Sequence, residues 1–322
     1  MFRLDISTPR LVAERLFTKA HGLKRYVETE LLRRALADKR VVITGASSGI
    51  GRATALRVAE VGGEAVLLAR SRERLEAVRD EIVRAGGRAT VHPCDLSSEE
   101  QCDAVVAAIV AEGPVDVLIN NAGRSIRRAL RFSYGRAHDF ERTMALNYFG
   151  ALRLTLGLLP HMRDRKRGHI INVSSAGVLV RAPRFAAYIA SKAAFDAFSQ
   201  VAASELFDDH IRVTTVYMPL VRTPMIAPTA IYRAAPALSP EQAADLTLQA
   251  LVTKQTYVRP LFAATADSLH RIAPRLTQRA LSALYHRTPG QGGHGAVIAE
   301  SPAASNGELR ALGEHGARGE GT

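Results

Sequence analysis

Tyr188 and Lys192 stand four residues apart, and Ser175 precedes the tyrosine by thirteen residues. In a helix, residues i and i+4 lie on one face, so the phenol and the ammonium group would be neighbours. A free tyrosine has a pKa of about 10 and is a poor acid–base catalyst at neutral pH. A fixed cation beside it favours the phenolate and lowers that pKa. Together with a serine hydroxyl, this pair could move a proton on and off a carbonyl or alcohol oxygen.

A tyrosine and a lysine at this spacing also occur by chance, so the elements around them decide the matter. Short apolar runs typical of strands alternate with helical patterns, which predicts βαβ units and a parallel sheet with helices on both faces. Because crossovers are right-handed, the economical α/β topology is a doubly wound, Rossmann-like sheet. We expect strands at 41–44, 65–69, 89–92, 115–120, 169–173 and 213–217, and helices around 50–62, 71–85, 98–112, 139–163, 187–207 and 240–252.

The flanks of the chain differ from this alternating middle. We predict a helical N-terminal extension over residues 1–38, a main domain over 39–262, an amphipathic helix over 263–287 and a disordered tail over 288–322. The amphipathic helix combines aliphatic residues at roughly helical spacing with arginines. It could lie on a membrane surface, although a dimer contact or a helix that caps the core is the favoured interpretation.

The composition is that of a globular protein. The 322 residues are 47% hydrophobic and 23% charged, a length that suits one large α/β domain with extensions or two small domains. The two cysteines, Cys94 and Cys102, form no disulfide framework and no metal-ligand cluster. We therefore expect no metal site and a cytoplasmic location. The N-terminal segment lacks the apolar core of a signal peptide, and no apolar run of about 18 residues predicts a membrane-spanning helix.

The net charge of +12 and the pI of about 10.2 favour anionic partners. Nucleic acid is one interpretation, but the arginines are scattered and we recognise no nucleic-acid motif, so we expect no such partner. A cofactor or substrate that carries phosphate fits better. A peripheral contact with a membrane surface stays open, as does an arginine-rich surface that is merely solvated.

A glycine-rich loop follows the first expected strand. Its glycines would let the backbone turn tightly and approach a pyrophosphate, while the helix that begins there points free N–H groups at the phosphates. The spacing is Gly-x-x-x-Gly-x-Gly rather than the familiar Gly-x-Gly-x-x-Gly. We expect a dinucleotide to be bound by Gly45, Ser47, Ser48, Gly49, Ile50 and Gly51.

The end of the second expected strand indicates which dinucleotide is bound. An acid at this point would bind the ribose hydroxyls of NAD, whereas this chain has Arg70. An arginine can instead bind a 2′-phosphate, with Ser47 and Arg52 as candidate helpers. The sequence therefore predicts NADP(H), with a merely exposed Arg70 as the alternative.

Taken together, these motifs resemble the short-chain dehydrogenase/reductase family over about residues 39–260. The glycine-rich loop looks like the family's cofactor loop, and Asp95 matches the acid that contacts adenine. The segment Asn120-Asn121-Ala122-Gly123 matches the motif after the fourth strand, which lines the cofactor site. Asn147 matches the helix asparagine that holds a proton-relay water, and Ser175, Tyr188 and Lys192 complete the family's catalytic tetrad.

The resemblance implies a role for each of these residues. Tyr188 would protonate the carbonyl oxygen as hydride arrives at the carbon, and Ser175, rather than its neighbour Ser174, would orient that oxygen. Lys192 would lower the pKa of the tyrosine and hold the nicotinamide ribose. Asn147 would link Lys192 to solvent through water.

One departure from the family pattern concerns the loop after the sixth strand. The family commonly has Pro-Gly there, whereas this chain has Pro219-Leu220. Pro219 and Thr223 are still expected at the cofactor, the threonine at the nicotinamide carboxamide. Losing the glycine stiffens the loop, which puts the family's general substrates in doubt.

Three stretches resemble the bacterial long-chain acyl-CoA reductases that form fatty aldehydes, namely 121–128, 138–144 and 218–229. They imply that NADPH reduces an acyl-CoA thioester. The alternatives are reduction of a ketone or 3-oxoacyl group to the alcohol, and a non-catalytic NADP-binding protein. Coenzyme A phosphates could be attracted by Arg124, Arg127, Arg128 and Arg131, and an acyl channel could be lined by Leu220, Val221, Met225 and Ile226. Family members commonly pair through the helices at 139–163 and 187–207, which implies a homodimer or homotetramer.

Overall fold

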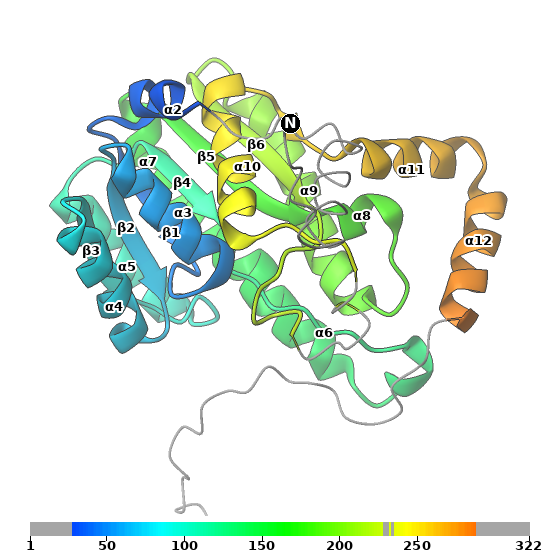
Figure 1. The fold of residues 1–322 in the computed structure, drawn as a ribbon. Coiled ribbons are helices and arrows are strands. Elements are labelled where there is room, and N and C mark those ends of the chain that lie inside the picture. Colours follow the sequence, from blue (N-terminus) through cyan, green and yellow to red (C-terminus); the bar gives the residue numbers. More distant parts are fainter. Residues whose placement is uncertain (1–27, 228–231, 233–234, 288–322) are drawn as a thin grey trace, which may run out of the picture.

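The computed structural model describes residues 28–227, 232 and 235–287. Within them, a parallel sheet has the strand order β3-β2-β1-β4-β5-β6-β7 (Figure 1). The strands are β1 (Arg40–Thr44), β2 (Glu64–Ala69), β3 (Arg88–Pro93), β4 (Val117–Asn120), β5 (Gly168–Ser175), β6 (Ile211–Met218) and β7 (Tyr257–Val258). This order confirms the doubly wound, Rossmann-like sheet. Its direction of winding reverses between β1 and β4, where such sheets bind ligands at their carboxyl ends.

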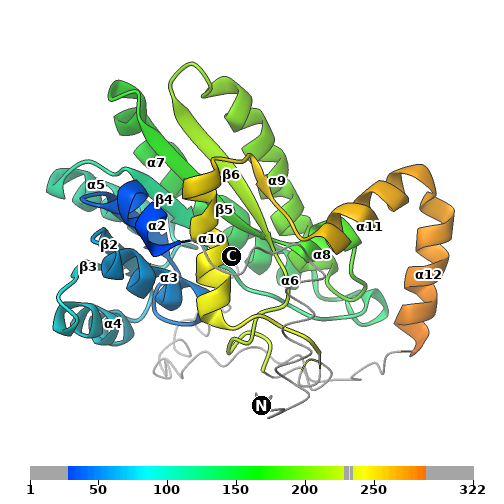
Figure 2. The same cartoon turned by 45° about the horizontal axis from the view of Figure 1, so that its top comes forward.

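Helices cover both faces of the sheet (Figure 2). The side chains of β1 explain why, because Val41 and Ile43 belong to one hydrophobic cluster and Val42 to the other. A strand buried on both sides reads as a continuous aliphatic run. One cluster is covered by α2 (Thr29–Leu36), α3 (Gly49–Glu60), α4 (Arg72–Arg84) and α10 (Pro240–Thr253), and the other by α5 (Glu99–Glu112), α7 (Ala151–Asp164) and α9 (Ala186–Glu205).

Serine side chains begin several of these helices. Ser71 accepts a hydrogen bond from the N–H of Arg74 at the start of α4, and Ser98 begins α5 in the same way. At α10, Ser239 and Gln242 form a reciprocal capping box. These local signals explain why the helices begin close to where the sequence predicts them.

The helix expected over 139–163 is interrupted. It consists of α6 (Ala137–Met144), a π-helical turn η2 (Ala145–Gly150) and α7. Gly150 lies so close to the next segment that a Cβ there would approach the Leu96 carbonyl oxygen to 2.4 Å. Short π-helical turns recur at functional sites, and this one carries Asn147.

The single helix expected over 263–287 is two helices, so that prediction is corrected. α11 (Leu261–Ile272) ends before Ala273, and α12 (Pro274–Arg287) starts at the proline. Proline lacks an N–H group and disfavours helical backbone at the residue before it, so Pro274 favours a new helix that begins with it. The helical periodicity hides this break because apolar residues continue on both sides of it.

Smaller elements complete the fold. A 3-10 turn η1 (Leu130–Phe132) precedes α6, and a short helix α8 (Ala176–Val180) follows β5. No helix in the described part of the chain is long and apolar enough to cross a membrane. Of the predicted N-terminal extension only residues 28–38 are described, and the predicted tail over 288–322 lies outside the described residues.

Candidate active site

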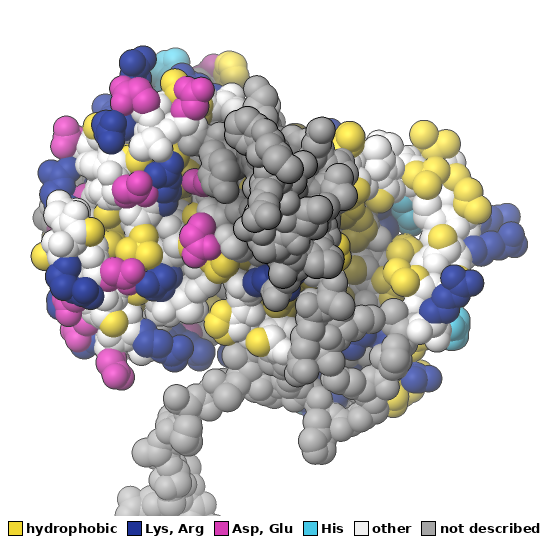
Figure 3. All heavy atoms as spheres, in the orientation of Figure 1, with side chains coloured by type: hydrophobic (Ala, Val, Ile, Leu, Met, Phe, Trp, Pro, Cys, Tyr) yellow, Lys and Arg dark blue, Asp and Glu magenta, His cyan; other side chains and the backbone are white. Residues whose placement is uncertain are grey.

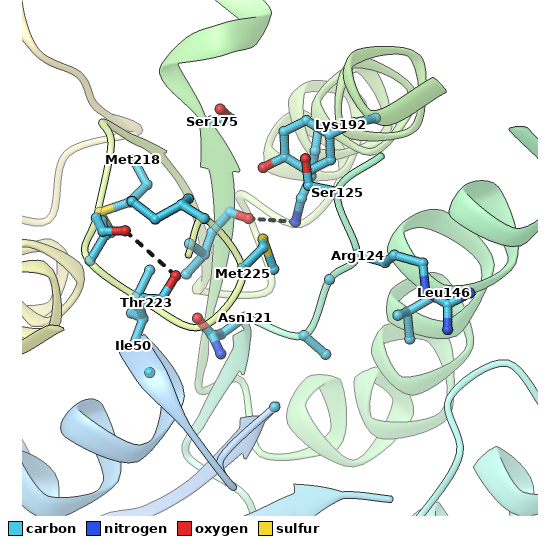
Figure 4. Close-up of a pocket in the computed structure, with 18 of the residues that line it drawn as sticks. Ile50, Asn121, Arg124, Ser125, Leu146, Ser175, Lys192, Met218, Thr223 and Met225 are labelled. Atoms are coloured by element: carbon cyan, nitrogen blue, oxygen red, sulfur yellow. Dashed lines mark hydrogen bonds between the residues drawn. The ribbon is translucent and has the colours of Figure 1, made fainter. Parts of the chain in front are cut away.

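A large cavity lies at the carboxyl end of the sheet, where the strand order reverses. Its volume is about 1360 Å³, more than the 300–1,000 Å³ of a typical small-molecule site, so there is room for a dinucleotide and a second ligand. The predicted cofactor and catalytic residues line it except for Gly51 and Asn147. In Figure 4, Ser175 and Lys192 lie toward one end of the cavity, and Ile50 and Asn121 lie toward the other.

Tyr188 and Lys192 lie one turn apart on α9, and Ser175 ends β5. The Lys192 side chain is buried, and its Nζ donates a hydrogen bond of 2.7 Å to the Val173 carbonyl oxygen. The Ser175 hydroxyl accepts a hydrogen bond from the Gly177 N–H at 3.0 Å, and it also hydrogen-bonds to Tyr188. The serine therefore caps α8 and contacts the phenol at once, which gives its hydroxyl a defined position.

The electrostatics of the pair differ from the sequence expectation. Burial raises the pKa of Tyr188, and only the hydrogen bond with Ser175 acts in the opposite direction. Burial also lowers the pKa of Lys192, to about 8. Lys192 is not among the groups that shift the Tyr188 pKa, so the prediction that it lowers this pKa is not met. The phenol is held in its protonated form, which suits a group that gives a proton to a substrate oxygen.

Asn147 lies behind the cavity wall. Its Oδ1 accepts a hydrogen bond from the Arg124 N–H at 2.8 Å, and its Nδ2 donates to the Arg124 carbonyl and the Ser191 hydroxyl at 2.9 Å each. These bonds hold the backbone of Arg124, next to Gly123. Gly123 lies close to the lysine, since a Cβ added to it would be 3.5 Å from the Lys192 Nζ. The contacts make Asn147 a positioning residue, and the water relay stays a prediction.

The glycine loop forms the cradle that the sequence predicts. Gly45 and Gly49 have left-handed backbone, with φ of 68° and 54°, which favours glycine. A Cβ on Gly51 would lie 2.3 Å from the Gly45 carbonyl oxygen, so Gly51 packs beneath the loop and does not line the cavity. Ser47 and Ser48 line it at the start of α3. This arrangement suits a pyrophosphate at a helix N-terminus.

A threonine that the sequence reasoning overlooked ties the cradle to β4. The Thr44 hydroxyl accepts hydrogen bonds from the N–H groups of Asn121 and Ala122, at 2.9 and 2.8 Å. Asn121 returns a side-chain bond of 2.8 Å to the Thr44 carbonyl oxygen. Asn120, by contrast, is buried beneath the site and donates to Asn172. The signal for Thr44 was a hydroxyl residue at the end of an otherwise aliphatic strand.

The end of β2 fits a 2′-phosphate. Arg70 is exposed, lines the cavity, and has no hydrogen-bond or ion-pair partner within the described residues. Asp95 lines the same region, and its Oδ1 accepts a hydrogen bond from the Ser97 N–H at 2.9 Å. Arg52, the predicted helper, instead pairs with Glu81 at 2.5 Å and does not line the cavity. The prediction that Arg52 helps to bind the 2′-phosphate is therefore wrong.

The loop after β6 gives the cavity part of its apolar lining. The expected channel residues Leu220, Val221, Met225 and Ile226 all line it, together with Phe262 from α11. The described residues contain no group of side chains arranged to hold a metal ion.

The four arginines predicted for coenzyme A are not equivalent. Arg124, Arg127 and Arg128 line the cavity, but the Arg128 guanidinium is bound to the buried Asp139 at 3.0 Å. Arg131 lies over the Phe132 ring, at 4.7 Å from its centroid, and is outside the cavity wall. Three of the four predicted arginines therefore line the cavity, and Arg131 does not.

Several known proteins are similar to this chain in sequence and in fold. The family model described as short chain dehydrogenase matches residues 39–231. A "Fatty acyl-CoA reductase" of Acinetobacter baylyi is 50% identical over 260 residues, covering 80% of this chain and 88% of the relative. A "Fatty acyl-CoA reductase" of Mycobacterium tuberculosis is 47% identical over 242 residues, or 74% and 82% of the two chains. A metagenomic short-chain oxidoreductase solved in complex with NADP is 33% identical with a TM-score of 0.59, over 69% of this chain and 93% of that one.

Proposed function

The chain belongs to the short-chain dehydrogenase/reductase family of oxidoreductases, and we propose that it is an NADPH-dependent reductase that converts a long-chain fatty acyl-CoA to the fatty aldehyde and free coenzyme A. The observation that carries the proposal is the position of Tyr188, in one cavity that is lined both by the glycine loop and by apolar side chains of the loop after β6. The identity with two proteins named fatty acyl-CoA reductase supports this substrate.

The cofactor is NADP(H). The glycine cradle and the start of α3 would hold the pyrophosphate, and Arg70 would bind the 2′-phosphate, since no acid replaces it at the end of β2. Asp95 and Asn121 would line the adenine and nicotinamide halves, and Thr223 would face the carboxamide. When bound there, NADPH would supply the hydride that reduces the substrate carbonyl carbon.

The chain's own residues would handle the proton and the developing charge. Ser175 donates a hydrogen bond to the thioester oxygen, and Tyr188, whose pKa is raised by burial, gives that oxygen its proton. The resulting hemithioacetal collapses when its C–S bond breaks. The hydroxyl proton then leaves the oxygen, the aldehyde C=O forms, and the sulfur departs as the thiol of coenzyme A. This route needs no cysteine nucleophile.

Product analysis tests this proposal. The purified protein is incubated with NADPH and a panel of saturated acyl-CoA esters, ketones and 3-oxoacyl thioesters, while NADPH oxidation and free thiol are followed together. We expect acyl-CoA to yield aldehyde, with thiol released in proportion to the NADPH oxidised. Turnover of ketones or 3-oxoacyl groups without thiol release would establish the rival reductase activity, and no turnover of any substrate would indicate a non-catalytic NADP-binding protein.

We also propose that the protein is a homodimer or homotetramer that pairs through α7 and α9 in the cytoplasm. Exposed apolar side chains on and just after these helices support the pairing, among them Leu156, Val201 and Phe207, which is 77% exposed. Light scattering of the full chain measures the assembly. A monomer at micromolar concentration would contradict it.

A further inference from the structure

The C-terminal helices α11 and α12 form an arm at the edge of the molecule. In Figures 1 and 2 the arm stands at the side of the sheet opposite β3 and α4. It is fastened to the loop that precedes the catalytic tyrosine. Arg181 donates to Asp267 of α11 at 3.0 Å, and Arg184 donates to the Tyr285 carbonyl oxygen at 2.8 Å while lying over the Tyr285 ring. The arm therefore has a fixed place beside the cavity.

The arm exposes aliphatic side chains to solvent. On α12, Thr277, Leu281 and Tyr285 are half-buried at intervals of four residues, so this row faces the body. No residue of α12 is fully buried. Leu276 on the outward side is 61% exposed, and Ile272 at the end of α11 is 83% exposed. Exposed aliphatic residues gathered on one face mark an interaction surface.

The same helices are strongly basic. Between residues 261 and 287 there are four arginines and one aspartate, and that aspartate, Asp267, is already bound by Arg181 and Arg271. Arg275, Arg279 and Arg287 have no ion-pair partner within the described residues. Figure 3 shows dark blue basic side chains beside yellow hydrophobic ones at the right-hand edge of the molecule, where α11 and α12 lie.

The arm also reaches the wall of the cavity. Phe262 of α11 and Arg184, the residue that holds α12, both line the cavity wall. The loop between α8 and α9 thus connects the arm to Tyr188 within a few residues.

We propose that the outward face of α11 and α12, carried by Ile272, Leu276, Arg275 and Arg279, docks on an anionic lipid surface. Aliphatic side chains would enter the headgroup boundary while the arginines meet lipid phosphates, as in interfacial amphipathic helices. A second copy of this chain is a poorer partner, because a two-fold contact would place these arginines against the same arginines. Delivery of acyl substrate from that surface to the cavity rests on the proposed function, whereas the binding itself does not.

The test is co-sedimentation of the full-length protein with vesicles. One preparation is phosphatidylcholine alone, and the other contains equal parts of phosphatidylcholine and phosphatidylglycerol. We expect binding to the anionic vesicles that weakens with salt. Ile272→Asp with Leu276→Asp should reduce that binding by at least about tenfold, and Arg275→Gln with Arg279→Gln by about tenfold.

Matched substitutions on α4, at the other side of the sheet, serve as controls. Val83→Asp changes an aliphatic residue that is 55% exposed, and Arg72→Gln with Arg84→Gln removes two exposed charges. Both should bind vesicles as the parent does. All variants should keep the parent's melting temperature and its turnover of a water-soluble short-chain substrate, so a failure of docking is distinguishable from a failure of the proposed reaction.

Three results would overturn the proposal. The first is no binding of the parent protein to anionic vesicles, and the second is binding that the arm variants leave unchanged. The third is conversion of an oligomer to a monomer by Ile272→Asp with Leu276→Asp without loss of vesicle binding, which would make a second copy the partner of this face.

Discussion

The two ends of the same parallel sheet treat their polar groups in opposite ways. At the amino end, Arg40 opens β1 and is 6% exposed, yet each of its three guanidinium nitrogens has a partner. It binds Glu64 and Glu112 and donates to the carbonyl oxygens of Ile109 and Gly113 at 2.6 and 2.9 Å. Buried polar groups with this many partners hold elements together.

At the carboxyl end, several polar groups have no hydrogen-bond or ion-pair partner among the described residues. Arg70 faces the cavity without a partner in the described part of the chain, and the Ser174 hydroxyl is buried there without a hydrogen bond. Burial there lowers the pKa of Lys192 and raises that of Tyr188. Groups kept in this condition contribute little to folding and are available to ligands. The comparison therefore assigns stability to one edge and chemistry to the other.

The largest expected effect is at the chemical edge. Tyr188→Phe removes only the hydroxyl that would give the proton, so kcat should fall by about 10³ to 10⁴-fold. The unfolding free energy should change by less than about 1 kcal/mol, since the ring packing is kept. Steady-state kinetics and urea unfolding measure the two quantities, and NADPH binding is the control. If the variant kept its kcat, Tyr188 would not be the proton donor, and the assignment of catalysis to the carboxyl end of the sheet would be wrong.

Arg40→Met should have the opposite signature. Losing the guanidinium leaves two carboxylates and two backbone carbonyls without their donor, and we expect a loss of about 3–4 kcal/mol in unfolding free energy. The activity per folded molecule should be unchanged. Arg88→Met is the matched control, because Arg88 also opens a strand at this edge but its ion pair with Asp38 is exposed. That control should change stability by less than about 0.5 kcal/mol.

His169 should make the free energy of unfolding depend on pH, and it lies at the amino end of the sheet. It lies at the start of β5, is 7% exposed, and its Nε2 is 2.9 Å from the Thr214 hydroxyl. Burial, with help from the charge of Arg212, lowers its pKa to about 4. The unfolded chain therefore binds more protons between the ordinary pKa of 6.5 and about 4. Stability should fall as pH falls through that window, by up to about 3 kcal/mol.

Denaturant unfolding at the two ends of that window measures the effect, and His169→Gln supplies the reference. The glutamine variant should lose the part of the pH dependence that His169 contributes. An identical pH dependence in both proteins would show that His169 titrates normally in the folded state.

Arg70 should affect ligand binding and not folding. Arg70→Ser removes the predicted contact with the 2′-phosphate, so the dissociation constant for NADPH should rise by about 10 to 100-fold. Affinity for NADH, which lacks that phosphate, should change little. Arg72→Ser is the matched control, since Arg72 is exposed, pairs with Glu76 and does not line the cavity. Equal losses for both cofactors would contradict the assigned role, and cofactor fluorescence titration measures them.

The sequence predicts the chemical edge better than the stability edge, for a physical reason. Gly45, Ser175 and Tyr188 are recognisable because chemistry requires those residue types at set spacings. Arg40 and Thr44 act through partners that are distant in sequence, and a single chain does not reveal those partners in advance. Arg52 shows the opposite failure. Because it follows the glycine loop in sequence, we predicted a contact with the 2′-phosphate, but in the fold it forms an ion pair with Glu81.

The strand order was predictable from the alternation of elements, but local backbone detail was not. Helical periodicity passes through the π-helical turn around Asn147 and through the break before Pro274 without a visible change. A hydrophobic pattern records which face is buried and is insensitive to one inserted residue or one missing N–H group. Proline at 274 was the only sequence signal for either feature.

The smallest expected effect separates two adjacent serines. Ser174 is buried with an unpaired hydroxyl, whereas the Ser175 hydroxyl caps α8 and contacts Tyr188. Ser174→Ala removes a polar group that has no partner in the described structure, so stability should stay level or rise by up to about 1 kcal/mol. Its activity should stay within about twofold of the parent. Ser175→Ala should instead lose about a hundredfold in kcat, because it removes the hydroxyl that we propose orients the substrate oxygen.

This pair tests whether an unpaired group at the carboxyl edge is always held for a ligand. If Ser174→Ala weakened cofactor or substrate binding, the Ser174 hydroxyl would be a ligand contact, as we propose for the Ser175 hydroxyl. If it only stabilised the protein, the edge would contain both groups reserved for ligands and groups left unpaired by the packing of β5 against β6. Parallel unfolding curves and NADPH titrations of the two variants distinguish these cases, because a ligand contact changes the dissociation constant and a packing defect changes only the unfolding free energy.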